Sequence, residues 1–197
     1  MKEQEGALAV KLARRGVDAE TRDLDIDTFD VPDGFRQKSG AFVTLKTFPG
    51  GDLRGCIGYP DPIFPLAEAI LRAAQGACHD PRFPPLRPEE LDQVVVEVSV
   101  LTPPEESKVE PRKDLPKHLV IGKDGLIVER GAFRGLLLPQ VPVEWGWDVI
   151  TFLEQACMKA GLTPDMWLDR RTRIHTFQAE IFHEESPYGQ ILRERNV

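Results

Sequence analysis

Hydrophobic residues recur along this chain with the two spacings that distinguish strands from helices. In Val94–Leu101, every second residue is a valine, so one face of a strand there would be wholly apolar. Between residues 66 and 77, the apolar residues repeat three and four positions apart, which predicts a helix with one buried face and Pro65 at its first turn. The same spacing predicts helices over residues 3–16 and 144–160, and a closing strand is expected over residues 173–183.

Residues that favour turns divide the remaining segments. Two β-type segments, residues 41–48 and 52–58, surround Pro49-Gly50-Gly51, which predicts an antiparallel hairpin. Short strands are expected over residues 126–130 and 133–138, because a glycine-bearing turn separates them. Residues 102–116 are polar and rich in proline, a composition typical of a boundary between subdomains.

Composition and charge exclude several classes of protein. The chain has 197 residues, 41% of them hydrophobic and 29% charged, as expected of a soluble globular protein. The formal net charge of −7 disfavours a nucleic-acid binder, because a phosphate backbone attracts a positive surface. We expect no membrane span, because no stretch approaches about 20 apolar residues, and the first residues lack the apolar region of a signal peptide. A cytoplasmic location is therefore expected.

The three cysteines, Cys56, Cys78 and Cys157, fit neither a disulfide framework nor a paired set of metal ligands. We accordingly expect no metal and no cofactor. Cys78 and Cys157 fall within apolar helical stripes, which predicts that both are core residues. Only Cys56 stands in a segment with candidate chemistry.

Cys56 is a candidate nucleophile because of its neighbours in the chain. Alternation along a strand would place Arg54 on the same face, about 6.6 Å away, where its charge would favour the thiolate. Gly55 and Gly58 would leave backbone N–H groups near the sulfur, able to hold an oxyanion. This interpretation predicts a thiol pKa below about 8.5. The alternative is that Cys56 is a small core residue and that the glycines let the sheet pack closely on the helix over residues 66–77.

A cysteine nucleophile also needs a base. His79 follows the helix over residues 66–77, so the chain could fold it back near Cys56, whereas His175 lies on the apolar side of its strand. Glu97 and Ser99 share one strand face, and a solvated face is the simpler explanation for them. None of these residues forms a recognisable catalytic spacing.

The segment Leu53-Arg54-Gly55-Cys56-Ile57-Gly58 resembles the hallmark hexapeptide of the AMMECR-type domain family, which takes its name from the AMME-syndrome candidate gene. The resemblance continues in order through most of residues 5–184, in the blocks Asp80–Pro85, Val96–Thr102, Gly122–Leu126, Leu138–Val141 and Cys157–Leu162. It implies an α+β fold of two subdomains, each with an antiparallel β-sheet and packed helices, and a cleft between them. We expect a single AMMECR-type domain over residues 1–197. Its larger subdomain would comprise residues 1–104 plus 171–197, and its smaller inserted subdomain residues 105–170.

The resemblance implies that the hexapeptide lines this cleft but carries over no established activity. The first hypothesis is a cysteine-dependent enzyme or modification factor that acts on a protein or other sizeable substrate. Cys56 would be its nucleophile, and the substrate would contact Leu53, Arg54, Gly55, Ile57 and Gly58. The alternative is a non-catalytic module that binds a peptide or protein. The family also suggests a pathway link to Memo-like and radical-SAM proteins, and we expect no nucleic-acid or membrane partner.

Overall fold

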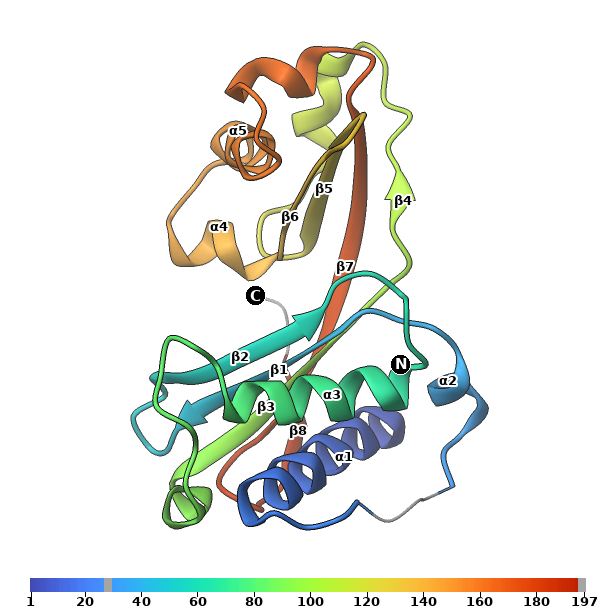
Figure 1. The fold of residues 1–197 in the computed structure, drawn as a ribbon. Coiled ribbons are helices and arrows are strands. Elements are labelled where there is room, and N and C mark those ends of the chain that lie inside the picture. The colour runs from blue at the N-terminus through green and yellow to red at the C-terminus, as the bar shows by residue number, and fades with distance from the viewer. Residues whose placement is uncertain (27–29, 195–197) are drawn as a thin grey trace. The chain divides into compact units, whose positions relative to one another are not determined.

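The computed structural model describes residues 1–26 and 30–194, which fold into two compact units (Figure 1). Unit 1 holds Met1–Leu101 and the described residues from Glu180 onward, and unit 2 holds Thr102–Ala179. Residues 195–197, which the sequence assigned to the larger subdomain, lie outside the described residues. Helices and antiparallel strands occur in both units, so the expected α+β class is confirmed, while the expected subdomain boundaries stay a prediction.

Unit 1 is a curled antiparallel sheet with two helices packed on one face. In sheet order its strands are β2 (Leu53–Tyr59), β1 (Ala41–Thr47), β3 (Val94–Leu101), the end of β7 (Arg173–Glu184) and β8 (Ile191–Arg193). Its helices are α1 (Glu3–Arg22), α2 (Asp33–Arg36), α3 (Leu66–Cys78) and the 3-10 helix η1 (Pro88–Gln93). In Figure 1, α1 and α3 lie side by side against the sheet. The predicted hairpin, the valine strand and the alanine-rich helix are all confirmed.

The core of unit 1 explains why the apolar positions recur as they do. Val43 and Leu45 of β1 and alternate valines of β3 point toward α1 and α3, and all are buried. The prediction that the first helix ends at Gly16 is wrong, since α1 continues to Arg22. A Cβ atom at Gly16 would lie 3.0 Å from the Cβ of Ala74, so this glycine allows two helices to approach.

A buried ion pair joins the start and the end of unit 1. The Arg14 Nε donates to a Glu184 carboxylate oxygen at 2.9 Å, and the other Glu184 oxygen accepts from Arg14 Nη2 and from the backbone N–H of Val96. Both side chains of the pair are almost fully buried. The contact ties α1 to β7 and β3, which are distant in the chain.

Unit 2 is a smaller antiparallel sheet covered by a helix. Its strands, in order across the sheet, are β6 (Phe133–Leu137), β5 (Asp124–Arg130) and the start of β7, and β4 (Glu105–Glu106) also pairs with β7. Its helices are α4 (Gln140–Glu144), α5 (Val149–Lys159) and the 3-10 helices η2 (Arg112–His118) and η3 (Pro164–Leu168). The helix predicted over residues 144–160 is interrupted between α4 and α5. Gly146 adopts a φ of 63°, which ends the first helix, and Asp148 caps the second by accepting a hydrogen bond from the Thr151 N–H.

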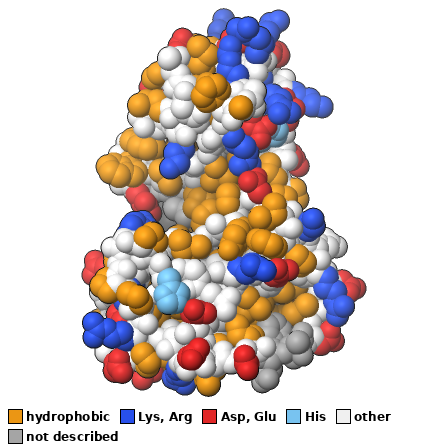
Figure 2. All heavy atoms as spheres, in the orientation of Figure 1, with side chains coloured by type: hydrophobic (Ala, Val, Ile, Leu, Met, Phe, Trp, Pro, Cys, Tyr) orange, Lys and Arg blue, Asp and Glu red, His pale blue; other side chains and the backbone are white. Residues whose placement is uncertain are grey.

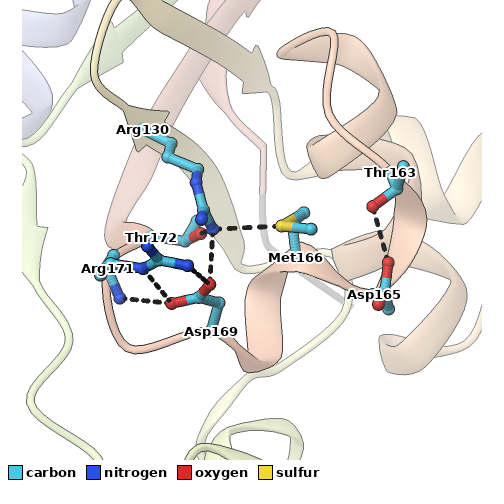
Figure 3. Close-up of polar contacts among 7 residues, drawn as sticks. All are labelled: Arg130, Thr163, Asp165, Met166, Asp169, Arg171 and Thr172. Carbon is cyan, nitrogen blue, oxygen red and sulfur yellow. Dashed lines mark hydrogen bonds and ion pairs between the residues drawn. The ribbon is translucent and has the colours of Figure 1, made fainter.

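Charged side chains of unit 2 form an ion cluster around Asp169 (Figure 3). The Asp169 carboxylate contacts the guanidinium groups of Arg130 and Arg171, each at 2.9 Å. Arg130 also donates to Thr172 Oγ1 at 3.2 Å and lies 3.1 Å from Met166 Sδ. Hydrogen bonds from Arg171, followed by the one from Arg130, hold the pKa of Asp169 well below its usual range. The cluster fastens the end of β5 to the loop that leads into β7.

Figure 2 shows acidic and basic side chains on the surface of both units, with apolar side chains among them. Among the helices of residues 1–26 and 30–194, none combines the length and the apolar composition needed to cross a bilayer.

Candidate functional site

The hexapeptide forms most of β2, which lies at the edge of the unit 1 sheet. Its glycines are sites of close packing. A Cβ atom at Gly55 would collide with the carbonyl oxygen of Ala77 in α3, and one at Gly58 would collide with the ring of Phe42. Ile57 in turn covers Gly76 of α3, where a Cβ atom would lie 2.9 Å from the isoleucine. Close packing therefore accounts for both glycines of the hexapeptide.

A β-bulge separates Arg54 from the rest of the strand. Leu45 of β1 pairs with Gly55, but the next residue of β1 pairs with Leu53, so Arg54 is an extra residue in the ladder. This interrupts the alternation that would place Arg54 beside Cys56. Its guanidinium group instead donates to both carboxylate oxygens of Glu90, at 2.8 and 3.1 Å. This contact is the main cause of the lowered pKa of Glu90.

Cys56 is half-buried, and its thiol has a hydroxyl neighbour. Thr44 lies opposite Cys56 in the β1–β2 register and donates its Oγ1–H to the sulfur at 3.3 Å. Burial raises the pKa of the Cys56 thiol above its ordinary value, although the hydrogen bond from Thr44 and the charge of Arg82 act in the opposite direction. The expectation of a lowered thiol pKa is therefore wrong, because the sequence does not show the desolvation that dominates here.

A buried carboxylate protects the free edge of β2 beside Cys56. Asp80 Oδ2 accepts from the backbone N–H of Cys56 at 2.8 Å and from Arg82 Nη2 at 2.7 Å. Its Oδ1 accepts from the Arg82 backbone N–H and Nε, both at 3.0 Å. Arg82 Nη2 also lies 3.5 Å from the carbonyl oxygen of Cys56. The hydrogen bonds from Arg82, despite burial, hold the pKa of Asp80 well below its usual range. The Asp80–Arg82 pair thus occupies the edge groups that another strand would bind.

The candidate base, His79, pairs with a residue of α1. Its Nε2 lies 2.9 Å from a carboxylate oxygen of Glu20 on α1. In residues 1–26 and 30–194, the side-chain hydrogen bond of Cys56 is the one from Thr44, and no histidine hydrogen-bonds to its sulfur. His175 lies in unit 2, and Cys78 and Cys157 are fully buried, with thiol pKa values raised to about 11, so their predicted place in the core is confirmed.

Polar side chains form a row on the sheet face opposite α1 and α3. Thr44 stands between Cys56 on β2 and Glu97 on β3, directly paired with each. Glu97 is buried and accepts from Lys46 Nζ at 2.6 Å. We refer to Cys56, Thr44 and Glu97 as the polar row.

Comparison with known proteins decides the family. The AMMECR1 family model matches residues 10–182, which is most of the chain. This protein belongs to the AMMECR1 family. A relative from Thermococcus gammatolerans, named only as a protein, is 51% identical and covers 98% of this chain and 97% of its own. Protein MJ0810 of Methanocaldococcus jannaschii is 50% identical, and the match covers 98% of this chain and 96% of that protein. The crystal structure of the uncharacterized protein PH0010 from Pyrococcus horikoshii superposes with a TM-score of 0.86 at 50% identity and covers 98% of both chains.

Within this AMMECR1-family chain, the block Asp80–Pro85 is part of the family resemblance, but its residues alone do not indicate that it contacts Cys56. Asp80 and Arg82 lie 24 and 26 positions from Cys56, and their bonds to its backbone depend on how α3 returns the chain to β2. Thr44 lies on β1, the strand before the one that contains Cys56, and it belongs to no sequence motif. Its role becomes visible only once the register of the hairpin is known.

Proposed function

We propose that this AMMECR1-family protein is a binding module that captures a peptide or partner protein at the start of β2. The observation that carries the proposal is the arrangement around Phe83. The guanidinium carbons of Arg54 and Arg82 lie 5.9 and 5.7 Å from the centre of its ring. Arginine and aromatic side chains contribute most to binding energy at protein interfaces. Leu53, which is 40% exposed, adds an apolar contact at the same end of the strand.

The arginines are held in position before any partner arrives. Arg54 is fixed by Glu90 and Arg82 by Asp80, so little side-chain entropy is lost when a partner binds. Arg82 remains 57% exposed despite its ion pair. Arg54 is 12% exposed and binds both carboxylate oxygens of Glu90, so Arg82 supplies the exposed cation. An exposed guanidinium group beside an aromatic ring suits a partner with carboxylate and apolar side chains.

A second candidate is the cysteine-dependent enzyme or modification factor that acts on a protein or other sizeable substrate. It is favoured by one observation: Cys56 is half-buried, whereas Cys78 and Cys157 are fully buried. The thiol pKa weighs against it, because less thiolate is present at neutral pH than for an ordinary cysteine. We expect the alkylation rate of Cys56 to keep rising with pH beyond about pH 9, measured by iodoacetamide labelling and peptide mass spectrometry. A plateau at pH 8 or below would instead favour the nucleophile.

Capture experiments separate the two functions. Immobilised wild-type and Cys56→Ser proteins are exposed to purified candidates, with Memo-like and radical-SAM proteins as the first to be tried, and washed under native and denaturing conditions. Equal capture by both proteins that is lost on denaturation supports the binding module. An adduct that survives denaturation only on the wild type supports the enzyme.

The position of the binding surface is tested with two exposed apolar residues of unit 1. Leu53→Ser is expected to reduce capture at least about tenfold, because it removes an exposed apolar side chain at the start of β2. Ile63→Ser is the matched control, since Ile63 is also exposed but lies outside the hexapeptide. Equal losses in both variants, or in neither, would refute the proposed surface.

A further inference from the structure

Three side chains of types that bind metals in other proteins meet on one face of the unit 1 sheet. Glu97 comes from β3, His183 from β7, and Glu194 directly follows β8. One ligand atom from each residue lies within 4.8 Å of the other two. Because two of the residues belong to strands of one sheet and the third directly follows another of its strands, the sheet itself holds them together.

Strand register fixes the side of the sheet on which they meet. Phe182 packs into the core with α1, so the next residue, His183, points to the opposite face. Glu97 pairs with Thr44, whose neighbours in β1 are core residues, and therefore lies on that same face. The backbone N–H of Glu194 donates to the carbonyl oxygen of Ile181 at 2.9 Å, which anchors the third residue beside β7.

Two polar groups of this cluster are buried with few or no hydrogen-bond partners among the described residues. Glu97 is 7% exposed, and its carboxylate is balanced by Lys46, whose side chain is 37% exposed. A lysine that exposed can turn toward water and leave the carboxylate to another cation. The Nδ1 of His183 is buried and, among the described residues, has no hydrogen-bond partner. Buried polar atoms without a partner are rare and call for an explanation such as an ion.

We infer that Glu97, His183 and Glu194 form a binding site for one divalent transition-metal ion of the Zn²⁺ class. One imidazole and two carboxylates suit zinc or manganese better than calcium or magnesium, which prefer oxygen ligands alone. Two carboxylates offset the charge of a divalent cation, and an imidazole ligand adds no charge. The expectation of no metal rested on the spacing of the cysteines, but no cysteine belongs to this site. Its three residues are too far apart in the sequence to form a spacing motif.

The test is calorimetric titration of Zn²⁺ into the untagged, chelator-treated chain in a Cys56→Ser background, which removes the half-buried thiol as a competing ligand. One ion per chain is expected to bind. Glu194→Gln and His183→Asn are each expected to weaken binding at least about tenfold. Glu194→Gln is the safer variant for folding, because Glu194 is exposed. Lys46→Met is expected to strengthen binding, since it removes the cation that competes for Glu97.

Matched controls separate this site from surface binding. Glu185 and His118 are exposed and outside the cluster, so Glu185→Gln and His118→Asn are expected to leave the affinity unchanged. Circular dichroism melting curves establish that each variant is folded. The inference is overturned if no saturable binding occurs, if cluster and control variants bind alike, or if Lys46→Met weakens binding.

Discussion

The Asp80 carboxylate is expected to be the main polar support of the hexapeptide strand, and Asp80→Asn tests this directly. The carboxylate is almost fully buried and accepts the backbone N–H of Cys56 in addition to three hydrogen bonds from Arg82. An asparagine has nearly the same size, so the substitution removes charge with little change in packing. One of the two carboxylate oxygens would be replaced by an NH2 group, which cannot accept a hydrogen bond from the Cys56 N–H or from Arg82.

The expected loss of stability is about 2–3 kcal/mol at pH 7. A hydrogen bond to a charged group contributes roughly 1.5–3 kcal/mol, and the bond from the Cys56 N–H belongs to this class. The ion pair with Arg82 adds at most about 1 kcal/mol, because that guanidinium group is 57% exposed and screened by water. The difference is measured as the free energy of unfolding in urea, followed by far-ultraviolet circular dichroism.

The pH dependence gives the reasoning a second test. The folded state holds the pKa of Asp80 well below its usual range, so its carboxylate stabilises the fold fully above the unfolded pKa of about 3.9. That stabilisation declines as the pH falls below about 4, because the unfolded chain takes up a proton first. The stability gap between wild type and Asp80→Asn should therefore narrow in this range. Asp92→Asn, at an exposed aspartate of η1, is the control. A loss of unfolding free energy in Asp80→Asn within about 0.5 kcal/mol of that in Asp92→Asn at pH 7 would refute this role of Asp80.

Two further substitutions test the packing and the buried charges of unit 1. Gly55→Ala should lower the free energy of unfolding in urea by about 1–3 kcal/mol, because its Cβ atom would collide with the carbonyl oxygen of Ala77, which cannot rotate away. Gly34→Ala is the control, because a Cβ atom there would meet no atom of the described residues within 4 Å. Equal effects of the two substitutions would contradict this explanation. Glu184→Gln should cost about 3–5 kcal/mol by leaving Arg14 buried without its counter-ion, and a loss below about 1 kcal/mol in the same assay would show that the pair is unimportant.

Periodicity predicted the central strands and the helix α3 of unit 1, but it predicted neither α2 nor β8 and could not assign the role of each glycine. The valine strand and α3 follow from their apolar spacing alone. Gly16 was expected to end a helix, a role in which glycine is common, yet it lies within α1 where Ala74 approaches. Gly146 has the positive φ of a true helix terminus and does break the helix predicted around it. The two glycines differ in their packing, since Ala74 and Leu71 approach Gly16, whereas no described atom lies within 4 Å of a Cβ atom at Gly146.

The candidate site was less predictable, because its chemistry depends on contacts between distant segments. The strand containing Cys56 could be predicted, but the bulge at Arg54 depends on the register with β1. Glu90 lies 36 positions from Arg54 and takes the guanidinium group that was assigned to the thiol. Burial then reverses the expected direction of the thiol pKa shift. Alternation places side chains on faces, but it says nothing about bulges, ion-pair partners or desolvation.

These contacts change what a substitution in the hexapeptide can reveal. At Gly55 and Gly58 any side chain collides with a neighbour, and loss of Arg54 removes the cation paired with Glu90 as well as a proposed binding residue. A loss of function at these three positions therefore does not separate structural damage from loss of binding. Leu53 is exposed and Cys56→Ser keeps nearly the same volume, so both can change while the strand stays intact. Loss of partner capture with Leu53→Ser and its retention with Cys56→Ser would therefore locate function on the surface of β2 and assign the thiol a packing role beside Thr44.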